Sequence, residues 1–212
     1  CEAADECKAR KVWNRIYKNM NLVLDGITLA DLLRDQKRYV YLDHSATTAV
    51  DDEVLAGMLP FFSEKPGNAS SQHGMGREAE AAVDIARKQV ADAIGAKTNE
   101  IYFTSGGSES DNWAIKGIAH SYKSKGKHLI TSEFEHPAVL NTMKYLEGEG
   151  YEVTYLKTDK EGYIRPDELE KAIRDDTVLV SVMYANNEIG TIQPIPELAK
   201  IAHEHGAFFH TD

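Results

Sequence analysis

Four short polar segments of the chain carry residue types that can bind or transform a small ligand. They lie at 104–110 (Thr-Ser-Gly-Gly-Ser-Glu-Ser), at 135–137 (Glu-His-Pro), at 186–190 (Asn-Asn-Glu-Ile-Gly) and at Asp212. Each follows an apolar, strand-like run, and in open α/β sheets ligands collect where strands end and helices begin. We therefore expect the four segments to converge on one ligand.

The glycine turn at 104–110 is a candidate phosphate site. Gly106 and Gly107 would let a phosphate approach the backbone, and nearby hydroxyls such as that of Ser108 could donate hydrogen bonds to it. The turn has neither the Gly-Lys-Ser/Thr of a P-loop nor the GxGxxG of a dinucleotide site. A plain capped turn is the alternative interpretation of the same residues.

The other three segments offer a ring, an amide and a carboxylate. His136 could stack on a planar ligand or move a proton, or it could cap the following helix. The amides of Asn186 and Asn187 could bind a ligand or only form a turn before Gly190. Asp212 should face a cation or a protonated heterocycle, or else cap a following helix. A ligand with a phosphate, a flat ring and a basic ring nitrogen fits this set, and pyridoxal 5′-phosphate has those parts.

Strands and helices are predicted to alternate from residue 39 onward. Apolar runs bounded by turn formers predict strands, and apolar residues at three- and four-residue spacing predict helices. The predicted strands are 39–42, 100–104, 128–131, 151–156, 178–183 and 207–210, and the predicted helices are 52–58, 77–94, 108–120, 137–147, 165–174 and 196–205. This order favours an α/β fold with a mainly parallel sheet and flanking helices.

Residues 1–38 differ in character from the rest. They hold 8 basic and 6 acidic residues, a net charge of +2, whereas residues 39–212 hold 16 basic and 28 acidic residues, a net charge of -12; together these give -10. An amphipathic helix is predicted over 12–24, and a short second helix begins near Thr28. We place a domain boundary at Arg38, so that a helical appendage (1–38) precedes the α/β domain (39–212).

Composition excludes several classes of protein. A hydrophobic content of 42% with 27% charged residues is typical of globular chains, and no apolar run approaches the roughly 20 residues that span a bilayer. The acidic balance of residues 39–212 argues against a nucleic-acid surface there. Two cysteines cannot build a disulfide framework, which favours a reducing compartment, the cytoplasm. Because the sequence opens on Cys1 and stops directly after an apolar run, we expect a fragment.

Six motifs make residues 39–212 resemble the N-terminal half of a NifS/IscS-type cysteine desulfurase, a class V aminotransferase-like enzyme of the type I pyridoxal-phosphate fold. They occur in order at 41–48, 67–73, 104–112, 135–140, 186–191 and 209–212. The resemblance implies that the α/β domain is an incomplete copy of that fold.

The resemblance also implies a role for each matched site residue. Gly107 and Ser108 would hold the cofactor phosphate, and His136 would stack on the pyridine ring and assist proton transfer. Asn187 would bond the phenolic oxygen of the ring. Asp212 would pair with the pyridine nitrogen and keep it protonated, which makes the ring an electron sink.

The activity implied by the resemblance is the conversion of L-cysteine to L-alanine, with the sulfur passed as a protein persulfide to an iron–sulfur scaffold protein. Such enzymes act as homodimers. The family's Schiff-base lysine and nucleophilic cysteine lie downstream of the matched motifs, and Lys160, Lys200, Cys1 and Cys7 stand in other contexts. We therefore expect these 212 residues to be inactive alone.

Residues 1–36 resemble the C-terminal end of an IscR-like winged-helix repressor, on Cys1-x5-Cys7, residues 10–13 and residues 24–33. That resemblance implies an iron–sulfur cluster at Cys1 and Cys7, although a further upstream cysteine of the motif is not in this sequence; free thiols are the alternative. DNA would be read only by helices upstream of Cys1.

Three alternatives remain open from the sequence. The parent could be a fusion of an iron–sulfur-responsive regulator with a desulfurase. The α/β domain could belong to another enzyme of the same fold, such as a selenocysteine lyase or an aminotransferase. From a different class, the chain could be an interaction module that dimerises through the helix at 12–24.

Overall fold

The computed structural model describes residues 17–18, 21 and 40–212 of a chain that divides into two compact units, 1–50 and 51–212. Residues 17, 18 and 21 are helical, but most of the helices predicted over 12–24 and from Thr28, and the boundary at Arg38, lie outside the described residues. Residues 40–42 form no strand, so the strand predicted over 39–42 is wrong where it is described. The following residues instead close a turn on Asp43, whose carbonyl accepts from the N–H of Ala46 at 3.2 Å.

Residues 51–212 are described throughout and form six α-helices, one short 3-10 helix and four strands. In chain order these are α3 (Asp52–Ser63), α4 (Gly74–Ile94), the 3-10 helix η1 (Thr98–Glu100), α5 (Gly107–Ser121), β1 (His128–Ser132), α6 (Pro137–Gly148), β2 (Glu152–Leu156), α7 (Pro166–Ala172), β3 (Thr177–Ser181), α8 (Ile195–Glu204) and β4 (Phe208–His210). Every helix predicted in this unit is present, and four of the five strands predicted there are present.

Local residue chemistry explains several helix ends. Proline stands at the first turn of α6 and α7, where its missing N–H costs nothing and its fixed φ suits the helix. Gly95 ends α4 with a φ of 71°, a left-handed conformation that glycine adopts without strain. Among the described residues, the structure contains no helix long and apolar enough to cross a membrane.

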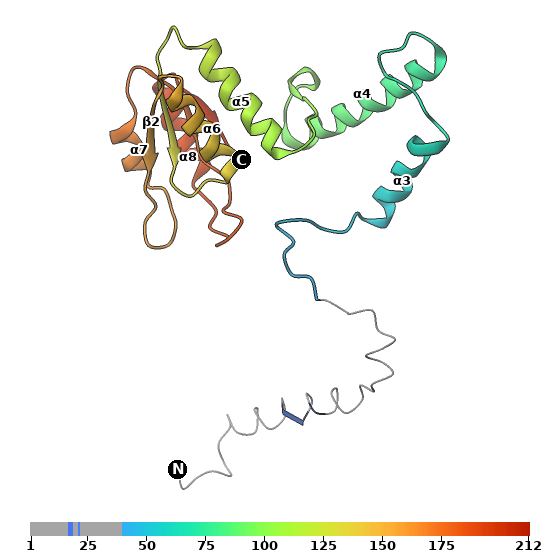
Figure 1. Ribbon diagram of the computed structural model, residues 1–212, viewed down its shortest axis with the longest axis horizontal. Helices are drawn as coiled ribbons and strands as arrows, with labels where there is room; N and C mark the ends of the chain where they lie inside the picture. The colour runs from blue at the N-terminus through green and yellow to red at the C-terminus, as the bar shows by residue number, and fades with distance from the viewer. Residues whose placement is uncertain (1–16, 19–20, 22–39) are drawn as a thin grey trace. The chain divides into compact units, whose positions relative to one another are not determined.

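The four strands form one parallel sheet in the order β2-β1-β3-β4. Its edge strand β2 lies beside α7 in Figure 1. The crossovers from β1 to β2, from β2 to β3 and from β3 to β4 contain α6, α7 and α8 respectively. A parallel sheet needs such crossovers because its strands cannot be joined by a tight hairpin. The mainly parallel α/β fold predicted from the alternation of elements is therefore confirmed.

The central strands β1 and β3 are buried on both faces, and successive residues near their middle pack into different layers. Leu129 and Leu179 belong to an apolar cluster with residues of α5 and α6. Ile130 and Val180 belong to a second cluster with residues of α7 and α8. The two layers hold the carboxyl ends of β1, β3 and β4 side by side, which is the edge where the candidate site residues lie.

The predicted strand at 100–104 is wrong. Residues 98–100 form η1, and residues 101–104 pair with no strand of the second unit. The carbonyl of Ile101 accepts a hydrogen bond from the Arg87 guanidinium, and Tyr102 lies edge-on to Trp113 with ring centroids 5.5 Å apart. An apolar run forms a strand only where a partner strand supplies the hydrogen-bond ladder, and no strand of the second unit does so here.

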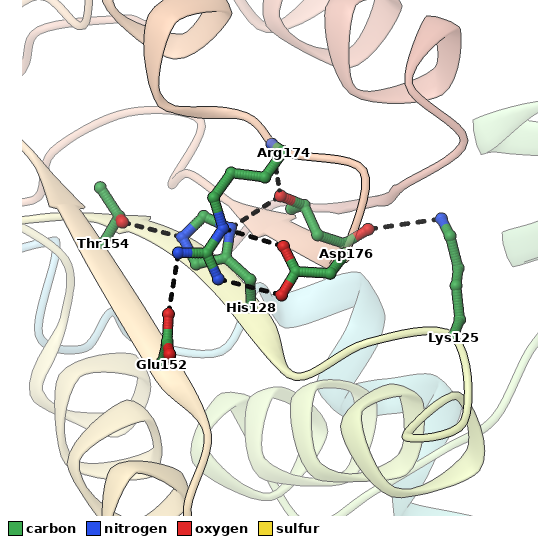
Figure 2. A network of polar contacts seen from close by, with 7 residues as sticks. Lys125, His128, Glu152, Thr154, Arg174 and Asp176 are labelled. Carbon is green, nitrogen blue, oxygen red and sulfur yellow. Dashed lines mark hydrogen bonds and ion pairs between the residues drawn. The ribbon is translucent and has the colours of Figure 1, made fainter.

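A polar network ties the opposite, amino edge of the sheet together (Figure 2). His128, at the start of β1, is buried, and its ring nitrogens lie 2.7 Å from Thr177 Oγ1 and 2.8 Å from Thr154 Oγ1. Beside it, Arg174 donates twice to Asp176, at 2.8 and 3.0 Å. Burial, followed by the nearby Arg174 charge, lowers the pKa of His128, and the two hydroxyls satisfy both of its ring nitrogens.

Candidate functional site at the carboxyl edge of the sheet

The glycine turn begins α5 at the carboxyl edge of the sheet. Gly106 caps the helix in an extended conformation, and Gly107 and Ser108 form its first turn. Thr104 Oγ1 braces the turn through Ser110 Oγ at 2.6 Å. The backbone N–H and hydroxyl of Ser105 are already used, because both donate to one oxygen of Glu109, at 2.6 and 2.7 Å.

The first-turn donors of α5 remain available to a ligand. Within the described residues, the N–H groups of Gly107 and Ser108 and the Ser108 hydroxyl have no hydrogen-bond acceptor. A Cβ atom added to Gly106 or Gly107 would meet nothing within 4 Å, so open space lies beside both residues. Unpaired N–H groups at the positive end of a helix are suited to an anion.

His136 follows β1 and caps α6, as one of the two sequence interpretations predicts. Its Nδ1 accepts from the N–H of Ala138 at 3.1 Å, and the side chain is exposed. Because Nδ1 is used as an acceptor, the neutral ring carries its proton on Nε2. The cap therefore fixes the ring at the edge of the sheet and leaves Nε2 as a donor.

Glu135, the residue before His136, fixes the loop after β1 to the segment after β3. Its side chain is buried, and Oε1 accepts from the N–H of Met183 at 3.0 Å and from the Ser132 hydroxyl. Burial raises its pKa to about 7, the two hydrogen bonds oppose that rise, and the Asp212 and Asp111 charges add to it. The second oxygen, Oε2, is buried without a hydrogen-bond partner among the described residues.

The two asparagines after β3 have different environments. Asn186 is buried, donates to the carbonyl of Phe134 at 3.0 Å, and accepts from the N–H groups of Glu188 and Ile189 at 2.9 and 3.0 Å. Asn187 is exposed, and its amide donates to the neighbouring carboxylate of Glu188 at 3.2 Å. Asn186 therefore stabilises the turn, whereas the Asn187 amide lies at the surface beside Glu188.

Asp212 lies just beyond β4, beside the end of β3. Its backbone carbonyl accepts from the N–H of Tyr184 at 2.8 Å, which continues the parallel pairing, and its side chain is exposed. Two residues earlier, His210 is mostly buried. Its Nδ1 lies 2.8 Å from Ser181 Oγ, and its Nε2 lies 3.5 Å from Oδ1 of Asp111. The carboxylate thus stands on a fixed backbone at the edge of the sheet.

The charges of two candidate site residues act on the pKa of Asp111, a residue of α5. Burial raises its pKa to about 6, the charge of Asp212 adds to the rise, and that of His136 opposes it. The carboxyl ends of β1, β3 and β4 lie side by side, so His136 after β1 and Asp212 after β4 stand at the same edge of the sheet. On α5, Asp111 lies one turn after Ser108, and its carboxylate is 3.5 Å from His210 of β4.

Sequence reasoning missed Asp111, Glu135 and His210. All three lie inside or next to the motifs named above, but their burial depends on which helix covers which strand. A usable signal is the three-residue spacing of Ser108 and Asp111, which places both on one side of α5. Cys1 and Cys7, the candidate cluster ligands, lie outside the described residues.

Comparison with known proteins gives a consistent family assignment. The aminotransferase class-V family model matches residues 40–212. A cysteine desulfurase IscS of Methanosarcina thermophila is 59% identical over 177 residues, which are 84% of this chain and 44% of that protein. A cysteine desulfurase IscS of Dictyoglomus turgidum is 57% identical over 176 residues, 83% of this chain and 45% of that protein. The chain therefore spans about half the length of the curated relatives it matches.

Solved structures agree with the fold. A NifS-like protein is 45% identical, covers 82% of this chain and 48% of its own, and superposes with a TM-score of 0.79. SspA in complex with cysteine is 44% identical, covers 81% of this chain and 50% of its own, and gives a TM-score of 0.78. With the parallel sheet and the site geometry above, these matches show that the chain belongs to the class V aminotransferase family and has the type I pyridoxal-phosphate fold of the NifS-like cysteine desulfurases.

Proposed function

We propose that the chain is the cofactor-binding part of a pyridoxal-phosphate-dependent cysteine desulfurase. The observation that supports the proposal is the presence of four different polar groups at the carboxyl edge of the sheet. They are the first-turn donors of Gly107 and Ser108, the capped ring of His136, the exposed amide of Asn187 and the exposed carboxylate of Asp212. The names of relatives more than 50% identical to the chain support the same activity.

The residues at this edge fit pyridoxal 5′-phosphate. Open space beside Gly106 and Gly107 leaves room for a phosphate against the unpaired N–H groups of α5. The exposed imidazole and carboxylate match a flat ring with a basic nitrogen. Asp212 needs no partner from the protein, because an exposed carboxylate keeps its hydration until a cation arrives.

The proposed mechanism assigns each residue one task. When bound, the cofactor would supply an electron sink for a carbanion formed on the amino-acid substrate. The N–H groups of Gly107 and Ser108 would orient the phosphate, and Asn187 Nδ2 would donate to the phenolic oxygen. Asp212 would accept a hydrogen bond from the protonated pyridine nitrogen and hold its proton in place. His136 would stack on the ring and donate at Nε2, because its Nδ1 is occupied by the Ala138 N–H.

For the whole protein we propose a complete cysteine desulfurase reaction. Its substrate is L-cysteine, its products are L-alanine and a protein persulfide, and an iron–sulfur scaffold protein accepts the sulfur in the cytoplasm. SspA, which is 44% identical, is described in complex with cysteine, and this supports the substrate. The parent acts as a homodimer, and residues 1–212 alone are inactive because the matched motifs include neither the Schiff-base lysine nor the nucleophilic cysteine.

Residues 1–38 have a separate proposed origin. We infer from their motifs that they are the end of an IscR-like iron–sulfur regulator, with Cys1 and Cys7 as cluster ligands in the parent and DNA contacts upstream. The family model matches from residue 40 onward, after this segment, which supports a separate origin.

Substitutions in the anion turn and at the carboxylate test the proposed cofactor site. Pyridoxine 5′-phosphate is the probe, because it keeps the phosphate and the ring but has no aldehyde to react with surface lysines. Ser108→Ala and Asp212→Asn should each weaken its binding by about tenfold, since each removes a hydrogen bond that involves a charged group. Titration calorimetry or probe fluorescence would measure the affinity.

A matched control lies at the other end of the same helix. Ser121→Ala removes an exposed hydroxyl from the last turn of α5 and should leave the affinity unchanged. Equal loss of affinity in Ser108→Ala and Ser121→Ala, or wild-type affinity in both Ser108→Ala and Asp212→Asn, would contradict the proposed site.

A further inference from the structure

A buried carboxylate on α5 stands behind the proposed site without a role in it. Asp111 is 4% exposed and lies one helical turn after Ser108. Its Oδ1 is 3.5 Å from Nε2 of His210, a separation that allows a weak direct contact. Burying a carboxyl group costs free energy of folding unless the group is protonated or paired, so the position of Asp111 calls for an explanation.

His210 joins this carboxylate to the sheet. Its other ring nitrogen, Nδ1, lies 2.8 Å from the hydroxyl of Ser181, which is fully buried in β3. The order Ser181, His210, Asp111 resembles that of a hydrolytic triad, but a serine with no exposed surface cannot attack a substrate. The three residues instead form a buried connection from β3 through β4 to α5.

The register of the sheet extends this connection into a row. Thr131 of β1 is aligned with Ser181 of β3, and Ser181 is aligned with His210 of β4. Aligned residues project to the same face of a sheet, so all three face α5 and α6. The Thr131 hydroxyl and the Glu135 Oε2 atom are both buried without hydrogen-bond partners among the described residues. These two buried oxygens could therefore form hydrogen bonds that none of the described residues supplies.

Asp212 lies on the same side as His210. Residues two apart along a strand project to one face, and the backbone at 212 continues the pairing of β4 with the end of β3. The charges that act on Asp111 come from Asp212, with the same sign, and from His136, with the opposite sign; Glu135 is coupled to both carboxylates. No lysine or arginine of the described residues is among these charges.

Two proton arrangements satisfy the connection from Ser181 through His210 to Asp111. If Asp111 is protonated, its O–H donates to Nε2 of His210, and Nδ1–H donates to the Ser181 oxygen. If Asp111 is ionised, Nε2–H donates to Asp111, and the Ser181 hydroxyl turns to donate to Nδ1. Passing from the first to the second moves the Asp111 proton to Nε2 and releases the Nδ1 proton to solvent. One proton leaves in total, and the imidazole stays neutral in both arrangements.

We propose that Asp111 is a positioning residue that acts through Asp212, switching to its ionised arrangement when a cation pairs with Asp212. The inference rests on the proposed function, in which that cation is the protonated ring of the cofactor. Neutralising Asp212 removes the like charge that opposes ionisation of Asp111. The second negative charge then adds to the attraction for that cation, and the tautomer of His210 reports the change.

The first experiment uses the protein without any ligand. Nuclear magnetic resonance of the Asp111 carboxyl carbon and the His210 ring nitrogens, from about pH 5 to about pH 8, should show one shared transition in which the proton moves from Nδ1 to Nε2. Asp212→Asn, an exposed substitution, should lower the midpoint of that transition by about one pH unit. Glu204→Gln, which changes an exposed carboxylate of α8, should not move it.

A His210 tautomer that stays constant over this range, or a midpoint that is the same in Asp212→Asn, would overturn the inference. A purely structural Asp111 would show either result. Because this experiment needs no ligand, its outcome does not depend on the proposed cofactor.

The second experiment adds pyridoxine 5′-phosphate at about pH 5.5. Calorimetry in two buffers of different ionisation enthalpy should show up to about one more proton released per ligand by the wild type than by Asp111→Asn. The Asn side chain keeps an acceptor for His210, and its affinity for the probe should be about fivefold to tenfold lower. Equal proton release in both proteins would overturn the inference, whereas a wild type that does not bind the probe would count against the proposed function.

Discussion

Glu135→Gln should remove a pH dependence of stability worth about 3 kcal/mol. Burial raises the pKa of Glu135 from 4.5 to about 7, and a pKa difference of that size between the unfolded and folded states corresponds to about 3 kcal/mol of unfolding free energy. The side chain is only 4% exposed, so solvent screens little of this cost. Glutamine keeps an oxygen that can accept from Met183 and Ser132, but it cannot ionise.

The direction of the effect follows from the raised pKa. Between about pH 4.5 and pH 7 the unfolded carboxyl releases a proton that the folded one keeps, so the contribution of Glu135 is full below pH 4.5 and is lost as the pH rises through 7. Urea unfolding at several pH values would compare the two proteins. Glu135→Gln should gain stability relative to the wild type across this range.

The control for this substitution is Glu133→Gln, which changes an exposed side chain two residues earlier and should leave the slope with pH as it is in the wild type. A constant difference between wild type and Glu135→Gln from pH 4.5 to 7.5 would show that the carboxyl is ionised in the folded protein. Glu135 would then have no part in the coupling between the carboxylates of the site.

Gly126→Ala should destabilise the protein by about 2 to 3 kcal/mol. A Cβ atom at this position would lie 2.0 Å from the carbonyl oxygen of Asp176, and backbone cannot rotate away as a flexible side chain can. The two segments approach closely because the backbone N–H of His128 donates to the same Asp176 carbonyl, at 3.3 Å. The substitution would push the starts of β1 and β3 apart at Asp176, which belongs to the network in Figure 2.

Gly148→Ala is the matched control, because a Cβ atom there would meet nothing within 4 Å at the end of α6. It should be neutral or slightly stabilising, since alanine favours helix over glycine. The free energy of unfolding in urea would be measured for both variants. Equal stability of Gly126→Ala and Gly148→Ala would contradict the tight approach of residues 126 and 176.

The sequence was enough to predict most of the second unit because its elements carry local signals. Proline at the first turn of α6 and glycine after α4 mark helix ends, and apolar runs mark β1 and β3. The strand predicted at 100–104 failed because strand formation needs a partner, which a single segment does not specify. The Arg87 contact and the edge-on rings that hold this segment instead come from α4 and α5.

The candidate site was predictable only in part. Strand ends could be placed at one edge, so the location of both His136 and Asp212 at that edge follows from the topology. The burial of Asn186 and the exposure of Asn187 could not be predicted, because the difference depends on the Phe134 carbonyl lying beside the Asn186 amide. The burial of Asp111 likewise depends on how α5 lies over β4, a tertiary contact with no local signature.

The central claim is that residues from α5, α6, β3 and β4 form one ligand site. Its most direct test maps amide chemical shifts of the chain during titration with pyridoxine 5′-phosphate. We predict that the largest changes cluster at Gly107, Ser108, His136, Asn187 and Asp212, and that His128, at the opposite edge of the sheet, does not respond. Changes centred on the amino edge, on the hollow between Tyr102 and Trp113, or on no defined surface would contradict it.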